Sequence, residues 1–207
     1  ELEENVLAVT TKDILSTEAQ FELVNKMRAS ILVMGPLLAR CGQAKISLPG
    51  GCAIGTRPID LHLKGFEALG AQIRVGHGFI EAAAPEGLKG AKIYLDFPSV
   101  GATENAILAA CGAEGTSVIY NAAREPEIVD LQALLRSMGA RVNGAGGSII
   151  TVEGGTALHG CTHRVIGDRI VCATYLCAAA AAGGEVRLTG VDYRAVSTVA
   201  LSLAESG

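Results

Sequence analysis

An internal repeat of about 69 residues is the feature that most limits how this chain can fold. Leu69–Ala71 and Met138–Ala140 each read hydrophobic-Gly-Ala and lie 69 residues apart. At the same offset Gly115 aligns with Gly184. Self-similarity at a fixed period predicts a fold assembled from copies of one supersecondary unit.

Each unit predicts helices and strands in a fixed order. An amphipathic helix ends at the hydrophobic-Gly-Ala turn, two strands follow around a short glycine hairpin, and a third strand leads through an Ala-rich helix into a last strand. This alternation favours the α/β (α+β) class. The expected helices are 17–41, 58–70, 103–113 and 126–138, and the expected strands are 6–9, 45–48, 72–75, 79–83, 92–95 and 117–120.

Composition excludes several classes of protein. Hydrophobic residues make up 49% of the 207 and charged residues 18%, which is enough apolar surface for a packed core and excludes intrinsic disorder. The net charge is −4, and no basic run offers a footprint for nucleic acid. The longest uncharged apolar stretch, 170–184, is shorter than the roughly 20 residues that cross a bilayer, so no membrane partner is expected.

The six cysteines form no CxxC pair, and neither they nor the histidines have the spacing of a metal site. We expect most of the cysteines to be small buried hydrophobes and the compartment to be a reducing cytoplasm. The chain opens on Glu1 without an initiator Met and closes in a helical pattern. We therefore expect a fragment of a longer protein.

The least ordinary segment is the glycine-punctuated loop Leu48–His62, with one thiol at Cys52 and a helix expected from Pro58. Nearby cations and helix N-terminal amides favour a thiolate, and Arg57 and His62 could supply that field. The alternative is a buried, inert cysteine.

Two segments could bind an anion. Arg57 adjoins a helix N-terminus, where phosphate binding is favoured, and the alternative is a solvated surface arginine. Ser99–Thr103 turns from a strand into a helix, and its backbone amides could hold a diphosphate. The alternative there is that Ser99 or Thr103 only caps the helix.

Two other groups favour structural roles. The carboxylates of 122–130 precede and begin a helix, where they complement its dipole. The four histidines have no spacing for a metal or a charge relay, and we expect them at the surface or in hinges. They are His62, His77, His159 and His163.

Four blocks of this sequence resemble the enolpyruvyl transferases that act on UDP-N-acetylglucosamine. The cysteine loop is the most specific block, because the related shikimate-pathway enzymes share the fold but differ there. The blocks are Met27–Ile31 with Gly35–Leu37, Leu48–Gly55 through His62, Ser99–Thr103, and Asn121–Asp130. The resemblance implies an inside-out α/β barrel of repeated βαβαββ units, as in EPSP synthase.

The resemblance also implies a domain division. Residues 1–166 would form most of the cysteine-loop domain, with its first repeat unit incomplete, and 167–207 would begin a second, truncated domain. A substrate-contacting Lys-Asn pair would lie before Glu1, and an aspartate base and a phosphate-binding arginine would lie after Gly207. The isolated chain is therefore expected to be inactive without the missing segments of its parent chain.

The implied reaction transfers the enolpyruvyl group of phosphoenolpyruvate to the 3′-hydroxyl of UDP-N-acetylglucosamine and releases phosphate, the first committed step of peptidoglycan synthesis. No cofactor and no metal is implied, and fosfomycin would modify the loop thiol. Phe97 stands where some relatives have a lysine near the diphosphate. The implied catalytic residues are Cys52 and Arg57, and the implied substrate-binding residues are Arg28, Arg57, Pro58, Ile59, Asp60, Leu61, Ser99, Val100 and Gly101.

Three alternatives remain open at this stage. The acceptor could be another alcohol, as in the shikimate-pathway enzyme. The chain could be a non-catalytic sugar-nucleotide-binding module with the same fold. A purely structural repeat protein would explain the periodicity but leaves Cys52 and Arg57 without a role.

Overall fold

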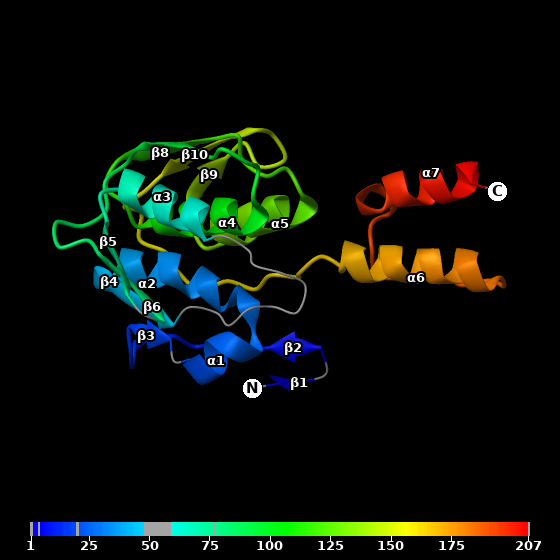
Figure 1. The fold of residues 1–207 in the computed structure, drawn as a ribbon, viewed down its shortest axis with the longest axis horizontal. Coiled ribbons are helices and arrows are strands. Elements are labelled where there is room, and N and C mark those ends of the chain that lie inside the picture. The colour runs from blue at the N-terminus through cyan, green and yellow to red at the C-terminus, as the bar shows by residue number, and fades with distance from the viewer. Residues whose placement is uncertain (1, 4, 20, 48–58, 77, 207) are drawn as a thin grey trace.

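The computed structural model describes residues 2–3, 5–19, 21–47, 59–76 and 78–206. Its body contains two copies of a βαβαββ unit (Figure 1). The first copy runs β3 (Glu18–Ala19), α1 (Phe21–Lys26), η1 (Arg28–Val33), α2 (Met34–Cys41), β4 (Gln43–Ser47), α3 (Asp60–Ala68), β5 (Gln72–Gly76) and β6 (Phe79–Ala83). The second runs β7 (Lys92–Tyr94), α4 (Val100–Cys111), β8 (Thr116–Tyr120), α5 (Pro126–Ser137), β9 (Arg141–Asn143) and β10 (Ile149–Glu153).

Each copy folds into a four-stranded sheet of the same topology. The strand orders are β3-β4-β6-β5 and β7-β8-β10-β9, with the first pair parallel and the other pairs antiparallel. In the parallel pairs Ala19 lies opposite Ile46, and Ile93 lies opposite Ile119. The repeat deduced from the sequence is therefore confirmed as a repeat of structure.

The hydrophobic-Gly-Ala triplets are the turns that end α3 and α5. Gly70 and Gly139 have φ values of 92° and 96°, which glycine adopts without the strain of a side chain. Ala71 and Ala140 then donate their N–H groups to the carbonyls of Phe66 and Leu135 at 3.0 and 2.9 Å. This local bonding explains why the triplet predicts helix ends correctly in both copies.

The core lies between the two sheets, where α4 packs against α2, α3 and α5 (Figure 1). Eight of the twelve residues of α4 are buried. Small residues allow the helices to approach closely: a Cβ on Gly35 would lie 2.7 Å from the Oδ1 of Asn105, and one on Gly112 would lie 2.6 Å from the Cβ of Ala39. The helix begins at Val100, earlier than the expected 103, because Ser99 is its N-cap.

The single helix expected over 17–41 is wrong. That segment contains β3, α1, the 3-10 helix η1 and α2. Pro36 has no N–H for a bond to the carbonyl of Leu32, so an α-helix cannot run through it unbroken. It is tolerated in the first turn of a helix that restarts at Met34.

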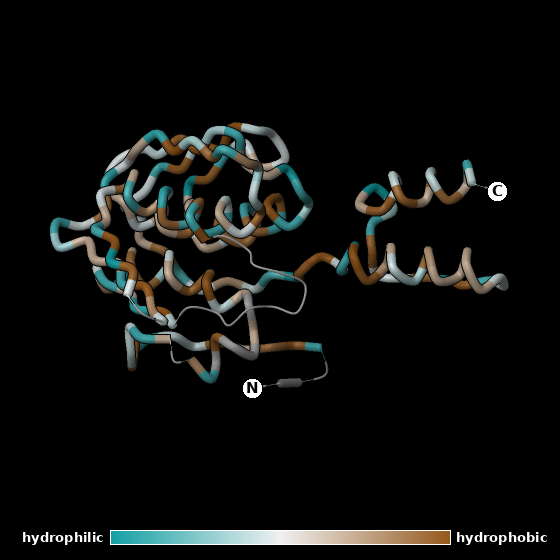
Figure 2. The backbone as a smooth tube through the Cα atoms, in the orientation of Figure 1, coloured by the Kyte–Doolittle hydropathy of each residue, from teal (hydrophilic) through white to brown (hydrophobic). Residues whose placement is uncertain are grey.

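The two ends of the described chain differ from the body. The strand expected over 6–9 is reduced to the exposed β2 (Val6–Leu7), whose one partner strand among the described residues is β1 (Leu2–Glu3). After residue 168, α6 (Arg169–Ala182), η2 (Tyr193–Ala195) and α7 (Ser197–Glu205) extend away from the sheets (Figures 1 and 2). The division into domains 1–166 and 167–207 stays a prediction. In the part of the chain that is described, no helix has the length and apolarity that crossing a membrane requires.

Candidate active site at the N-termini of α3 and α4

The turn before α4 lies beside the segment that follows β8. Strands β7 and β8 are parallel, so their carboxyl ends reach the same edge of the sheet. There the side-chain amide of Asn121 donates to the carbonyl of Leu95 at 2.8 Å, and the N–H of Ala123 donates to the Oγ1 of Thr103 at 3.0 Å. Two of the four blocks that carry the resemblance, 99–103 and 121–130, therefore meet.

Ser99 caps α4, as one of the two interpretations of this turn expected. Its Oγ accepts the N–H of Ala102 at 3.4 Å, and its carbonyl accepts the N–H of Thr103 at 3.0 Å. Thr103 does not cap the helix, because its hydroxyl bonds to Ala123. The amides of Val100 and Gly101 lie in the first turn, where N–H groups have no partner within their own helix. An anion at this turn would meet N–H donors and the positive end of the helix dipole.

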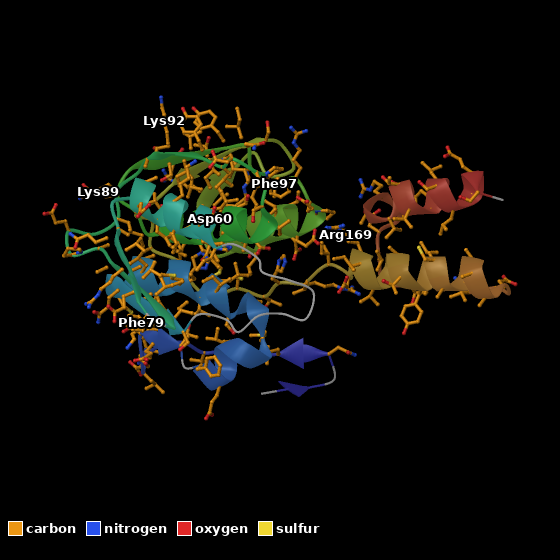
Figure 3. The ribbon with its side chains drawn as sticks, in the orientation of Figure 1. Asp60, Phe79, Lys89, Lys92, Phe97 and Arg169 are labelled. Atoms are coloured by element: carbon orange, nitrogen blue, oxygen red, sulfur yellow. The ribbon has the colours of Figure 1, made fainter. Side chains whose placement is uncertain are left out.

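The N-terminus of α3 lies against this turn. Ile59 is the N-cap of α3, the exposed Asp60 is its first residue, and Leu61 packs against the core (Figure 3). The next residue, His62, reaches α4: a Cβ on Gly101 would lie 3.2 Å from its Cε1 and 3.4 Å from its Nε2. The structure therefore brings together two of the predicted binding strips, 59–61 and 99–101.

The other predicted site residues are located only in part. Arg28 is the first residue of η1. Cys52, Arg57 and Pro58 lie outside the described residues, in the segment 48–58 that joins β4 to α3. The roles assigned to all of these residues stay predictions.

The surface around the α4 turn carries charges of both signs. An open hollow there is lined by Pro98, Asn121, Arg124 and Glu125. Burial raises the pKa of Glu104, one helical turn beyond the cap, and the nearby Glu127 carboxylate raises it further. Phe97 is largely exposed beside this turn (Figure 3).

Two carboxylates of α5 bind the segment that leads to α6. Glu127 accepts the Nε–H of Arg169, the first residue of α6, at 3.0 and 3.2 Å, and the Asp130 carboxylate lies 3.0 Å from the Nε2 of His163. All four side chains are partly buried. Glu127 lies in the first turn of α5, as the expected effect on the helix dipole requires, and the Glu127–Arg169 ion pair and the Asp130–His163 contact add tertiary contacts to that structural role.

The expectations for the histidines and cysteines need correction. His62 is 8% exposed and lies in the core rather than at the surface, His159 is exposed, and His77 lies outside the described residues. Of the five cysteines that are described, only Cys111 and Cys172 are buried. The prediction that most of the cysteines are buried is therefore wrong. Burial raises the pKa of the Cys111 thiol to about 11, which makes it an inert thiol at neutral pH.

Sequence reasoning missed the burial of His62 and did not identify Asn105, the two polar residues that meet next to the site. His62 lies three residues after Ile59 and four before Phe66, which is the spacing of one helical face. Asn105 lies in an Ala-rich helix whose residues after it, Ala106–Cys111, are all apolar. Each pattern indicates a polar side chain facing the core, and such a side chain needs a buried partner. No cluster of metal-ligating side chains occurs among the described residues.

Comparison with known proteins assigns this chain to a family. Residues 1–205 match the family model of EPSP synthase (3-phosphoshikimate 1-carboxyvinyltransferase). A UDP-N-acetylglucosamine 1-carboxyvinyltransferase of Gluconacetobacter diazotrophicus is 59% identical over 94% of this chain and 46% of its own length. The protein named UDP-N-acetylglucosamine 1-carboxyvinyltransferase 2 in Carboxydothermus hydrogenoformans is 57% identical over 99% of this chain and 48% of its own. The chain thus spans less than half the length of these curated relatives.

Solved structures share the fold. The enolpyruvyl transferase NikO from Streptomyces tendae superposes with a TM-score of 0.63 at 24% identity, over 77% of this chain and 38% of that protein. EPSP synthase from Acinetobacter baumannii superposes with a TM-score of 0.57 at 24% identity, over 73% of this chain and 34% of that protein. The α/β fold expected from the sequence, of the EPSP synthase type, is therefore confirmed. The family match, the repeated βαβαββ unit and the fold likeness agree that the chain belongs to the EPSP synthase family of carboxyvinyltransferases.

Proposed function

We propose that this chain provides the cysteine-loop part of an enzyme that transfers the enolpyruvyl group of phosphoenolpyruvate to the 3′-hydroxyl of UDP-N-acetylglucosamine. The observation that carries the proposal is the 57–59% identity, over more than nine-tenths of the chain, to relatives named for that reaction. The adjacent N-termini of α3 and α4 support it, because together they offer an anion site beside a partly apolar strip.

The proposed chemistry is an addition followed by an elimination. The acceptor hydroxyl adds to C2 of phosphoenolpyruvate while C3 takes a proton, which gives a tetrahedral ketal. Loss of a proton from C3 and cleavage of the bond between C2 and the phosphate oxygen then give the enolpyruvyl ether and inorganic phosphate. Cys52 is the proposed proton donor or product-release residue, and Arg57 and Arg28 are proposed to neutralise the charge of phosphoenolpyruvate.

The nucleotide is proposed to lie across the two helix N-termini. The diphosphate would bind the first-turn amides of Ser99–Gly101, and the uridine would lie against the strip 57–61. Both substrates are phosphorylated metabolites, so we place the reaction in the cytoplasm, at the start of peptidoglycan synthesis. The other half of the site, including the general base, is proposed to come from segments of the parent protein beyond this chain.

A chimera tests the proposal. The 207 residues replace the corresponding half of the Carboxydothermus hydrogenoformans relative, and phosphate release from phosphoenolpyruvate is measured with UDP-N-acetylglucosamine or shikimate 3-phosphate as acceptor. The same junction with the Gluconacetobacter diazotrophicus segment is the positive control. We expect turnover with the sugar nucleotide only. Turnover with shikimate 3-phosphate would support the other acceptor, and a folded but inactive chimera would support a non-catalytic module.

The role of Cys52 has its own test. Intact-mass analysis and peptide mapping after exposure to fosfomycin should find one adduct, on Cys52, that forms faster in the presence of UDP-N-acetylglucosamine. The variant Cys52→Ala should remain unmodified although Cys161 and Cys177 are exposed. An adduct on either of those two residues instead would contradict a selectively reactive loop thiol.

A further inference from the structure

A buried polar cluster joins three segments of the body. The side chain of Asn105 on α4 is fully buried and that of His62 on α3 is 8% exposed. The Asn105 Oδ1 accepts the N–H of Gly35 at 3.0 Å, and its Nδ2 donates to the carbonyl of Ile31 at 2.9 Å and lies 3.0 Å from the Nδ1 of His62. We call these two side chains, with the Gly35 N–H and the Ile31 carbonyl, the Asn105 hub.

The partners determine how the hub is protonated. A backbone N–H can only donate, so the oxygen of the Asn105 amide faces Gly35 and its NH2 group faces Ile31 and His62. The two amide hydrogens then go to the Ile31 carbonyl and to the Nδ1 of His62. His62 accepts at Nδ1, and its neutral imidazole therefore carries its hydrogen on Nε2.

The other edge of the His62 ring lies against the first turn of α4. A Cβ on Gly101 would lie closer to this ring than ordinary van der Waals contact allows, at 3.2 Å from Cε1. Gly101 does not have a positive φ. A side chain at this position would therefore displace the His62 ring by a few tenths of an ångström, whereas the backbone conformation itself does not call for glycine.

All three described segments that carry predicted site residues meet at this hub. Arg28 begins the 3-10 helix that contains Ile31, the strip 59–61 directly precedes His62, and the strip 99–101 touches the His62 ring. A shift of any one segment against the others would break a buried hydrogen bond, whose loss is costly where water cannot replace the partner.

The residues of the hub are not repeated along the chain. At the 69-residue offset, Leu131 on α5 takes the place of His62, and Thr174 on α6 takes the place of Asn105. The hydroxyl of Thr174 bonds within its own helix, to the carbonyl of Ile170 at 2.8 Å. The polar cluster thus occurs where the first copy, with the strip 59–61, meets the second, with the strip 99–101.

We propose that Asn105 and His62 are positioning residues, which hold the Arg28, 59–61 and 99–101 segments in the relative placement that binds the sugar nucleotide. This inference rests on the proposed function. Neither residue is assigned a contact with substrate: both act through the backbone segments that they hold together.

The first test is spectroscopic and uses the 207-residue chain. The imidazole 15N shifts of His62 should be pyrrole-like at Nε2 and pyridine-like at Nδ1 in the neutral state, and Asn105→Leu should shift the Nδ1 signal because it removes the hydrogen bond that this nitrogen accepts. A ring protonated at Nδ1 in the unaltered chain would overturn the hub, whatever the activity of the enzyme.

The second test measures KM for UDP-N-acetylglucosamine and kcat in the chimera. Asn105→Leu removes the three hydrogen bonds and should raise KM about tenfold or more, since small misplacements of binding groups are costly. Ile107→Ala is the matched control, because Ile107 is equally buried on α4 but is apolar and lies outside the predicted binding strips. Its KM should stay within about twofold of the unaltered value at a comparable loss of thermal stability.

A conservative replacement completes the test. His62→Asn places an oxygen near the position of Nδ1 and should keep KM close to the unaltered value, whereas His62→Leu should raise it as Asn105→Leu does. Equal effects of Asn105→Leu and Ile107→Ala on KM, in an active chimera, would overturn the positioning role and leave the proposed function standing. A folded but inactive unaltered chimera would overturn both.

Discussion

Helices α4 and α6 occupy the same position in successive repeats but have opposite surroundings. Both are Ala-rich, and both begin at a capped turn whose N-caps, Ser99 and Asp168, lie 69 residues apart. Eight residues of α4 are buried, whereas only Cys172 is buried on α6, which exposes Ile170, Val171 and Tyr175. The local sequence is thus sufficient to specify a capped helix, and burial depends on what packs around it.

The largest expected effect comes from adding volume at equivalent positions of the two helices. Ala109 on α4 is fully buried, and its counterpart Ala178 on α6 is exposed. Ala109→Leu should lower the free energy of unfolding by about 3 kcal/mol because the core has no room for three more carbons. Ala178→Leu should change it by less than about 0.5 kcal/mol. Urea unfolding measures both, and equal effects would contradict the difference in packing.

A buried hydroxyl should matter on α4 and not on α6. Thr103→Val leaves the buried N–H of Ala123 without its acceptor, which should cost about 2 kcal/mol. In Thr174→Val the lost bond is exposed and lies within the helix, so the change should be close to zero. Thermal melts of the two variants compare them directly, and a large loss for Thr174→Val would indicate that α6 is enclosed in solution.

The helix caps should behave alike, because capping is local. Ser99→Ala and Asp168→Ala should each destabilise their helix by about 1 kcal/mol. The effect of Asp168→Ala should be the larger of the two, since its carboxylate accepts from two amides, at 2.8 and 3.0 Å. Hydrogen exchange in the first turn of each helix gives the two values separately. Faster exchange throughout the body after Asp168→Ala would show that the cap is not a local feature.

The smallest expected effect is a pH dependence that only α4 carries. Burial and the Glu127 carboxylate raise the pKa of Glu104 above 4.5 in the folded chain, and its counterpart on α6 is Ala173. At pH values between the unfolded pKa of Glu104 and its higher folded pKa, the folded state binds more protons than the unfolded state. The Glu104 contribution therefore lowers the free energy of unfolding as the pH rises through this range. Glu104→Gln should be more stable than the unaltered chain at neutral pH and equal to it below about pH 4. An unchanged pH profile in this variant would rule out the contribution.

Much of the fold follows from short stretches of sequence. The ends of α3 and α5 were predicted correctly because the turn at Gly70 and Gly139 is made within six residues of chain. The segment 17–41 was predicted wrongly because the helical pattern outweighed Pro36, whose missing N–H ends the regular bonding. In the candidate site, the resemblance identified the strips 59–61 and 99–101. It did not predict that these two strips lie side by side.

The sequence by itself determined the repeat, the order of its helices and strands, and the caps and turns that delimit them. Those features depend on hydrogen bonds and side-chain periodicity within a few residues of chain. Only the tertiary structure decided that α4 is buried and α6 exposed, and that Asn105 meets partners 43, 70 and 74 residues away. Such contacts depend on how whole elements pack, because a buried amide can be satisfied only by groups that the packing of other elements brings to it.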